Sequence, residues 1–312
     1  MLDRKTGRTI VIKTHIRRRT RGTDSFASAI VLIRNPFRAI ISHYNFKESS
    51  GHQGIADWNI TMETSEHLNC DIHLAPNGSL PIVALASCPG SGNTWVRYLL
   101  EQATGIYTGS VYHDKRLQRG GLLGEMDEMN SGRTIAIKTH TRTMTSGTEL
   151  FTSAIVLFRN PFRAVISHYN FKETRDHRGV AKWEANMNTS RHWHNSSKKT
   201  MDWWRDVAKF WLTLYEKPIL VVHYEDLVND TVGELTRMLD FLHVPQKERR
   251  IDCVRNKLEG GFHRHSNVNQ ELQFAAFTPE MRSEIKNFTD WTSSILTQRG
   301  YKPIYRLKEL EV

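Results

Sequence analysis

The 312-residue sequence contains few cysteines, and their spacing excludes two kinds of small stabilised domain. Only Cys70, Cys88 and Cys253 occur, and no two of them form a C-x-x-C pair. Zinc ribbons and disulfide frameworks need cysteines in closely spaced sets. The sequence therefore indicates neither, and its length is ample for a domain with a substantial apolar core.

The sequence also lacks any apolar run of about 18 residues, the length that a membrane-spanning helix requires. Its first residues, MLDRKTGRTI, do not have the layout of a signal peptide. Six Asn-x-Ser/Thr acceptor sequences for N-glycosylation still favour a luminal glycoprotein, with an export signal outside this chain, over a cytoplasmic protein. The six asparagines are Asn59, Asn77, Asn188, Asn195, Asn229 and Asn287.

Acidic residues are outnumbered by basic ones. The sequence has 43 Lys and Arg against 33 Asp and Glu, which gives a formal net charge of +10. Such a charge favours an anionic partner, which could be nucleic acid, an anionic membrane surface, a phosphorylated cofactor or an acidic glycan. A basic surface that serves only solubility is the alternative.

A long internal repeat is the most unusual feature that is present. Without gaps, Gly7–His67 matches Gly132–His192 at 40 of 61 positions. The sequence "IVLIRNPFRAIISHYNFKE" from Ile30 returns as "IVLFRNPFRAVISHYNFKE" from Ile155. The period is too long for a solenoid. We interpret residues 1–77 as a partial duplicate plus linker, and residues 78–312 as the whole domain.

Alternating apolar runs and helical periods predict an α/β fold with a central parallel sheet flanked by helices on both faces. The ranges predicted as strands are Pro81–Cys88, Gly132–His140, Ser153–Asn160 and Pro218–Leu227. The ranges predicted as helices are Thr94–Gly105, a helix starting at Pro161, Thr200–Glu216 and Thr231–Val244. Trp203, Trp204 and Trp211 are expected in the helix core.

Polar or glycine-rich segments follow the predicted strands, where ligands of parallel sheets bind. The turn "PGSGNT" could hold a phosphate through Gly90, Ser91, Gly92 and Thr94, because strand, glycine loop and helix present backbone N–H groups to an anion. It is not a Walker A loop, since Asn93 stands where that motif has lysine, which disfavours a nucleoside triphosphatase. A turn without a ligand remains the alternative.

Two further pairs of residues follow other strands. Arg159 and Ser167 are spaced so that a guanidinium and a helix hydroxyl could hold a second phosphate. Lys138 and His140, two apart at a strand end, lie on one face and could stabilise negative charge and accept a proton. Each pair alone could also be an ordinary surface feature.

Together, the ordered motifs "PGSGNTW", "IKTH", "RNPFRAVISHY" and "VVHYEDL" resemble the sulfotransferases that use 3′-phosphoadenosine 5′-phosphosulfate (PAPS). The resemblance covers about Leu80–Val244, with "EGGFHRHS" at Glu259–Ser266 as a further match, and it implies a P-loop-like sulfotransferase fold. The glycine-loop segment is most similar to WSC-domain-containing, Golgi-type sulfotransferases. Their suspected acceptors are glycan hydroxyls, including those of sialic acid, so the resemblance implies the Golgi lumen or membrane.

The resemblance also implies roles for individual residues. His140 would be the catalytic base, and Lys138 would steady the transferred sulfuryl group. The residues implied in PAPS binding are Gly90, Ser91, Gly92, Asn93, Thr94, Trp95, Arg159, Ser167, Tyr224 and Arg264. The duplicate would carry only a half-site, formed by Lys13, His15, Arg34 and Ser42, and would not bind PAPS alone.

The sequence departs from the family at Gly90, where many relatives carry a lysine or arginine. Either Lys138 or Arg97 supplies the missing cation, or the site binds PAPS and turns it over poorly. The alternatives to a PAPS-dependent O-sulfotransferase are a non-catalytic PAPS- or anion-binding module and a nucleotide-dependent kinase. We expect no metal, although two His-x-His pairs leave zinc open, and no nucleic acid partner. The oligomeric state stays open.

Overall fold

The computed structural model describes residues 70–307 apart from 145–146, 245–246, 256–257, 259 and 261–269. Three sequence predictions therefore lie outside the described residues. They concern the duplicated fragment up to residue 69 with its half-site, the acceptor sequence at Asn59, and Arg264.

Five parallel strands form the central sheet, in the order β2-β3-β1-β4-β5. Their bounds are β1 Val83–Ser87, β2 Gly109–Ser110, β3 Ile137–Thr139, β4 Ser153–Phe158 and β5 Ile219–His223. The strands are almost entirely buried, as expected for apolar runs in a parallel sheet covered on both faces. The predicted α/β fold is thus confirmed.

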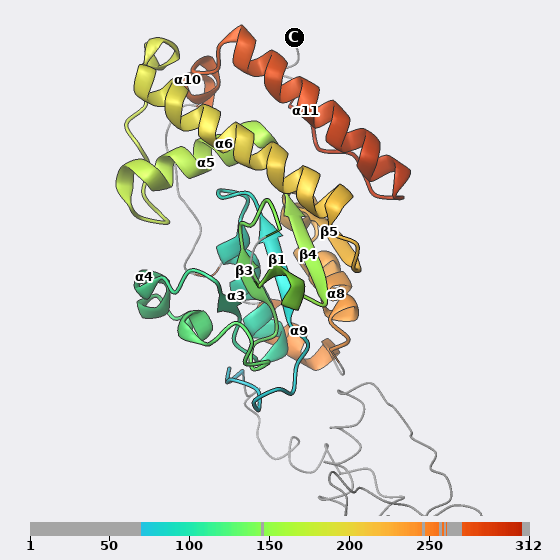
Figure 1. The fold of residues 1–312 in the computed structure, drawn as a ribbon. Coiled ribbons are helices and arrows are strands. Elements are labelled where there is room, and N and C mark those ends of the chain that lie inside the picture. The colour runs from blue at the N-terminus through green and yellow to red at the C-terminus, as the bar shows by residue number, and fades with distance from the viewer. Residues whose placement is uncertain are drawn as a thin grey trace, which may run out of the picture.

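Helices cover both faces of this sheet (Figure 1). One face packs Ala84 and Val156 against α5 Pro161–Thr174, α6 Arg191–Lys209 and α11 Pro279–Gln298. The other packs Leu85 and Leu157 against α3 Asn93–Thr104, α8 Thr231–Phe241 and α9 Lys247–Arg255. Alternate strand residues therefore serve the two cores, because side chains along a strand point to opposite faces.

The remaining elements are short. They are α4 Lys115–Arg119, η2 Leu123–Met126, η3 Thr148–Leu150, η4 Met187–Thr189, η5 Phe210–Leu214, α7 Tyr224–Asn229 and α10 Gln270–Ala275. None of the helices in the described ranges combines the length and the apolar content needed to cross a bilayer.

Local signals explain where the two helices nearest the glycine turn begin and end. Helix α3 ends at Gly105, which takes the left-handed conformation at φ 71°. Helix α5 begins with Pro161 after Asn160, whose side chain accepts a hydrogen bond from the backbone N–H of Arg163. Both helices were predicted from these residues.

Helix α6 begins nine residues before its predicted start at Thr200, so that prediction was wrong. Ser190 caps its N-terminus by accepting from the backbone N–H of Trp193. The stretch from 191 to 199 is mostly polar, which conceals the helix in the sequence. Its buried face is carried by Trp193 and Ser197, which continue the apolar stripe of Met201.

A disulfide joins Cys70 to Cys253, a pair that the sequence did not indicate. The bond spans 183 residues, so sequence spacing could not reveal it. Nearby, the backbone N–H of Ala75 donates to the carbonyl of Arg133, and His73 forms a bridge with Ile106. The packed part of the chain therefore includes residues 70–77, before the expected domain start.

Candidate active site

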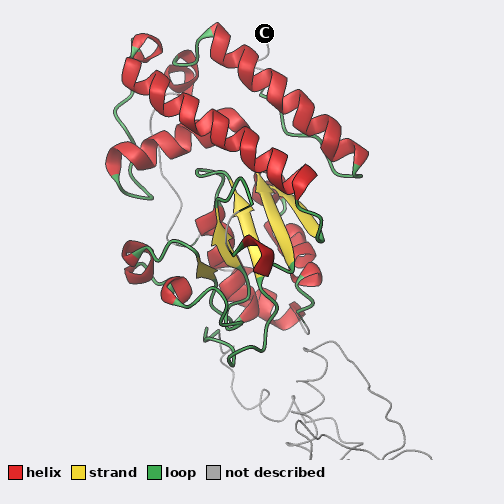
Figure 2. Ribbon diagram, in the orientation of Figure 1, coloured by secondary structure: helices red, strands yellow, loops and turns green. Residues whose placement is uncertain are grey.

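The carboxyl ends of the four longest strands meet at one edge of the sheet. In Figure 2 the loops that leave the arrowheads lie between the sheet and the long helices α5 and α6. This edge carries the Cys88–Gly92 turn after β1, His140 after β3, Arg159 after β4 and Tyr224 after β5. The topology thus brings the polar segments predicted from the sequence to one place.

The glycine turn makes two contacts that only glycine allows. At Gly90, with φ +86°, an added Cβ would lie 2.3 Å from the carbonyl oxygen of Ala164 and 2.9 Å from the backbone nitrogen of His168. At Gly92, with φ +97°, it would lie 2.6 Å from the Tyr224 ring. The turn is therefore pressed against α5 on one side and against Tyr224 on the other. A side chain at position 90 would therefore meet the backbone of α5.

Gly90→Ala should therefore destabilise the domain by more than the strain of a left-handed backbone conformation alone. We expect it to lower the unfolding free energy by about 2–3 kcal/mol, from left-handed strain plus the overlap with α5. Gly300→Ala is the matched control, because Gly300 has φ +77° but nothing within 4 Å of an added Cβ; it should cost about 1 kcal/mol. Urea denaturation measures both, and equal losses would contradict the close approach.

Arg159 links the turn to the neighbouring strand ends. Its Nη1 donates to the carbonyl oxygen of Gly90 at 2.9 Å, and its guanidinium lies 4.1 Å from the ring centroid of Tyr224. The indole of Trp204 donates to the Arg159 carbonyl at 3.0 Å. Arg159 thus lies directly beside the glycine turn. Ser167 lies on α5, in the turn of helix that touches Gly90.

Several buried polar atoms around the turn have no hydrogen-bond partner among the described residues. They are the hydroxyl of Ser91, Oδ1 of Asn93, Nε of Arg159 and Oε2 of Glu225. Buried polar groups in proteins are nearly always paired. Unpaired donors and acceptors gathered at one turn fit a site for a polar ligand.

Three of the predicted binding residues, Asn93 among them, also make contacts within the protein. The Asn93 amide donates to Leu85 O at 2.9 Å and Ser87 Oγ at 3.1 Å, which fixes the start of α3 to β1. The Trp95 indole donates to Leu258 O at 2.7 Å. The rings of Trp95 and Tyr224 meet edge to face at 5.7 Å, so in this conformation a planar base fits against them but not between them.

His140 is held in one tautomer. Its Nδ1 lies 2.7 Å from the carbonyl oxygen of Ser87, and because a carbonyl only accepts, Nδ1 carries the proton and Nε2 the lone pair. The Tyr112 ring stacks on the imidazole at 5.4 Å, and the Trp203 indole donates to the His140 carbonyl at 2.7 Å. Burial, with Lys138 second, lowers the pKa of His140 to about 3. The imidazole is therefore neutral.

Lys138 supplies a cation beside this imidazole. Its side chain is buried, its Nζ lies 5.7 Å from the Tyr112 ring centroid, and it has no hydrogen-bond acceptor among the described residues. Burial, and next the charge of Arg97, lower the pKa of Lys138 to about 8, while Glu125 and Asp114 oppose this shift. Lys138 is therefore a cation at neutral pH that an anionic group could bind.

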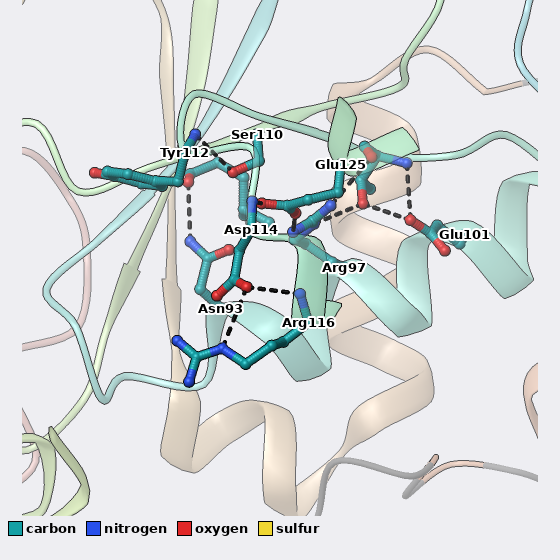
Figure 3. A network of polar contacts seen from close by, with 10 residues as sticks. Asn93, Arg97, Glu101, Ser110, Tyr112, Asp114, Arg116 and Glu125 are labelled. Carbon is teal, nitrogen blue, oxygen red and sulfur yellow. Dashed lines mark hydrogen bonds and ion pairs between the residues drawn. The ribbon is translucent and has the colours of Figure 1, made fainter. Parts of the chain in front are cut away.

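Arg97 does not supply the missing cation, contrary to one of the two expectations. Helix α3 directs it away from the turn, into the buried network of Figure 3. There it pairs with Glu125, and its Nε donates to Thr108 Oγ1 at 2.8 Å. Both charged side chains are fully buried. Of the two expected substitutes, Lys138 is the one that remains for the site.

The network in Figure 3 also supports the segment that carries Tyr112. Glu125 Oε1 accepts from the backbone N–H of Asp114 at 3.0 Å, two residues after Tyr112. Glu101 Oε1 accepts from both the backbone N–H and the hydroxyl of Thr108. Burial raises the pKa of Glu101 to about 7. Near neutral pH, Glu125 is thus the main counter-charge to Arg97.

Three residues of the site were not predicted as such. Tyr112 and Trp203 both hold His140, and His168 lies against Trp203 with ring centroids 6.2 Å apart. Of the three tryptophans expected in the helix core, Trp204 and Trp211 are buried there, whereas Trp203 is only partly buried. Only His168 left a sequence signal, because it lies within the repeated segment.

Residues 80–295 match the family described as the sulfotransferase domain. Since this match covers more than half of the chain, the protein belongs to the sulfotransferase domain family. Within it, the chain is similar to WSCD family members: it is 37% identical to WSCD family member CG9164 of Drosophila melanogaster over 211 residues, covering 67% of this chain and 64% of that protein. WSCD family member AAEL009094 of Aedes aegypti is 32% identical over 216 residues, covering 69% of this chain and 66% of that protein. The chain thus spans about two thirds of the length of these relatives.

Solved structures of the same class are more distant. The mouse sulfotransferase SULT7A1 complexed with PAP is 16% identical with a TM-score of 0.44, covering 68% of this chain and 84% of that one. A sulfotransferase from Alicyclobacillus acidocaldarius is 14% identical with a TM-score of 0.39, covering 74% of this chain and 98% of that one.

Proposed function

We propose that this sulfotransferase moves a sulfuryl group from PAPS to a hydroxyl of a carbohydrate, sialylated glycans included. The observation that carries the proposal is the neutral His140, with its Nε2 lone pair beside the unpaired cation of Lys138. A base can remove the proton from a hydroxyl, and a nearby cation can stabilise the negative charge that develops as a sulfuryl group moves to that oxygen.

The glycine turn and Arg159 are the proposed nucleotide site. Ser91, Gly92, Asn93 and Thr94 would hold the 5′ end of PAPS at the N-terminus of α3, where backbone N–H groups favour anions. Arg159 and Ser167 would hold the 3′-phosphate. The unpaired Ser91 hydroxyl and Arg159 Nε support this assignment.

PAPS, when bound, supplies the sulfuryl group. His140 Nε2 accepts the proton of the acceptor hydroxyl, whose oxygen then carries the charge needed for attack. Ser87 and Tyr112 keep the imidazole oriented throughout. Lys138 balances negative charge as it develops, in place of the cation that Gly90 cannot carry.

The acceptor side is basic and partly aromatic. The Arg142 guanidinium lies 5.1 Å from the Trp203 ring centroid and pairs with Asp206 at 3.6 Å, and Lys172 donates to Ser196 beside His168. Cations around an aromatic surface suit an acidic sugar, since the ring can contact apolar sugar faces and the charges can attract a carboxylate.

A luminal, Golgi-type location is part of the proposal. The Cys70–Cys253 disulfide supports this location, because disulfides persist in oxidising compartments. The five acceptor asparagines in the described residues, Asn77, Asn188, Asn195, Asn229 and Asn287, are all exposed.

Radiolabelled PAPS incubated with glycans that carry or lack sialic acid tests the proposal. We expect label on a glycan and stoichiometric release of PAP, with preference for the sialylated set. Binding of PAP without transfer to any acceptor would favour the non-catalytic module. A requirement for Mg²⁺ and ATP would favour the kinase.

The pH dependence of transfer should report Lys138. Since His140 is neutral far above its pKa of about 3, the base is ready throughout the working range. Lys138 loses its charge as the pH rises through its pKa of about 8. We expect kcat/KM to be flat from about pH 5 to 7 and to fall about tenfold per unit above about pH 8.

Lys138→Arg should remove this alkaline limb, because arginine stays charged. A pH–rate profile of both proteins measures the difference. An unchanged limb in K138R would assign it to another group.

A further inference from the structure

A second neutral imidazole lies beside the candidate base. The ring centroids of His140 and His168 lie 6.4 Å and 6.2 Å from that of Trp203, and both rings are nearly perpendicular to it, at 88° and 87°. The backbone of His168 also touches the glycine turn at Gly90. His168 therefore belongs to the same site, although the mechanism above does not use it.

The tautomer of His168 follows from its hydrogen bonds. Its Nδ1 lies 2.9 Å from Thr200 Oγ1, and this hydroxyl donates to Ser196 O at 3.0 Å. Because the single hydroxyl proton goes to the carbonyl, Thr200 Oγ1 accepts from Nδ1–H of His168. The lone pair is then on Nε2, as in His140. Burial, with Lys172 second, lowers the pKa of His168 to about 4, so the ring is neutral.

Two imidazoles thus offer Nε2 lone pairs that no described residue bonds. A single proton transfer needs only one of them. The other is a hydrogen-bond acceptor, and among the groups of a carbohydrate its natural partner is a hydroxyl. Both rings lie edge to face against one indole, so one sugar can reach both, and its hydroxyls are the donors it offers to the two Nε2 atoms.

We propose that His168 accepts a hydrogen bond through Nε2 from the acceptor hydroxyl next to the one that His140 deprotonates. The sulfated hydroxyl is then part of a vicinal diol. The inference rests on the proposed function and adds the class of hydroxyl that the site selects. A site built to bond a hydroxyl discriminates against analogues that lack it, because its own acceptor is left unpaired.

The test uses a glycan that the protein sulfates and that has a free hydroxyl next to the sulfated position. It is compared with its monodeoxy counterpart, which lacks only that neighbouring hydroxyl. For the unmodified protein, kcat/KM should favour the diol by about 10- to 100-fold. His168→Asn is the informative variant, because its amide N–H can keep the bond to Thr200 while the Nε2 acceptor is lost. H168N should accept both compounds equally. Thr200→Val removes the supporting bond but keeps the imidazole, so it should retain a preference for the diol.

The outcomes separate the two levels of the proposal. Loss of the preference in H168N with unchanged PAP affinity supports the inference. An undiminished preference in H168N, or no preference in the unmodified protein, overturns it while leaving the proposed function intact. PAP binding without transfer to any glycan overturns both.

Discussion

Asparagine in place of His140 should lower kcat for sulfuryl transfer by roughly 10²–10⁴-fold, the usual contribution of a positioned base. The substitution is chosen for its geometry. The amide N–H of asparagine can occupy the place of Nδ1 and keep the 2.7 Å bond to Ser87 O, while nothing replaces Nε2. Loss of activity then reports the missing base. Single-turnover transfer from labelled PAPS measures it.

Two controls accompany H140N. Affinity for PAP should stay within about twofold, because His140 is not among the proposed nucleotide contacts. His73→Asn makes the same chemical change at an exposed side chain and should transfer normally. Transfer by H140N at the unmodified rate would show that another group removes the proton.

Glutamine in place of Glu125 should lower the unfolding free energy by about 3–5 kcal/mol, the cost of breaking a buried ion pair by removing one partner. Arg97 and Glu125 are both fully buried, and their side chains form an ion pair. E125Q therefore leaves a buried guanidinium without its counter-charge. Urea denaturation with linear extrapolation gives the difference.

The control for E125Q is Glu128→Gln, the same change at an exposed carboxylate three residues later, with an expected effect within about 0.5 kcal/mol. A second readout links the network to the site. Glu125 raises the pKa of Lys138, so its loss should move the alkaline limb of kcat/KM to lower pH. Equal stability of E125Q and E128Q would contradict the role of the pair.

Local sequence patterns predicted the parts of the fold that local physics decides. Short apolar runs ended by polar residues marked β1 and β4, and Gly105 and Pro161 marked where a helix ends and another begins. The strand-end rule then predicted the glycine turn, Arg159, Lys138 and His140 at one edge of the sheet.

Long-range packing decided what the sequence could not show. The partner of Cys70 is 183 residues away, and Arg97 turns to Glu125 and to Thr108, the residue before β2. The roles of Tyr112 and Trp203 arise from hydrogen bonds with the backbone of His140, which nothing in their sequence positions indicates. The reason for Gly90 is likewise tertiary, since it is α5 that excludes a side chain there.

One calorimetric comparison tests the central assignment most directly: the affinity of the protein for PAP and for adenosine 5′-monophosphate, which lacks the 3′-phosphate. If the glycine turn and Arg159 hold the two ends of one nucleotide, PAP binds at least about tenfold more tightly, as a charge-assisted hydrogen bond predicts, and Arg159→Lys removes most of that advantage. Equal affinities for the two nucleotides, or an advantage that R159K leaves untouched, would contradict the account.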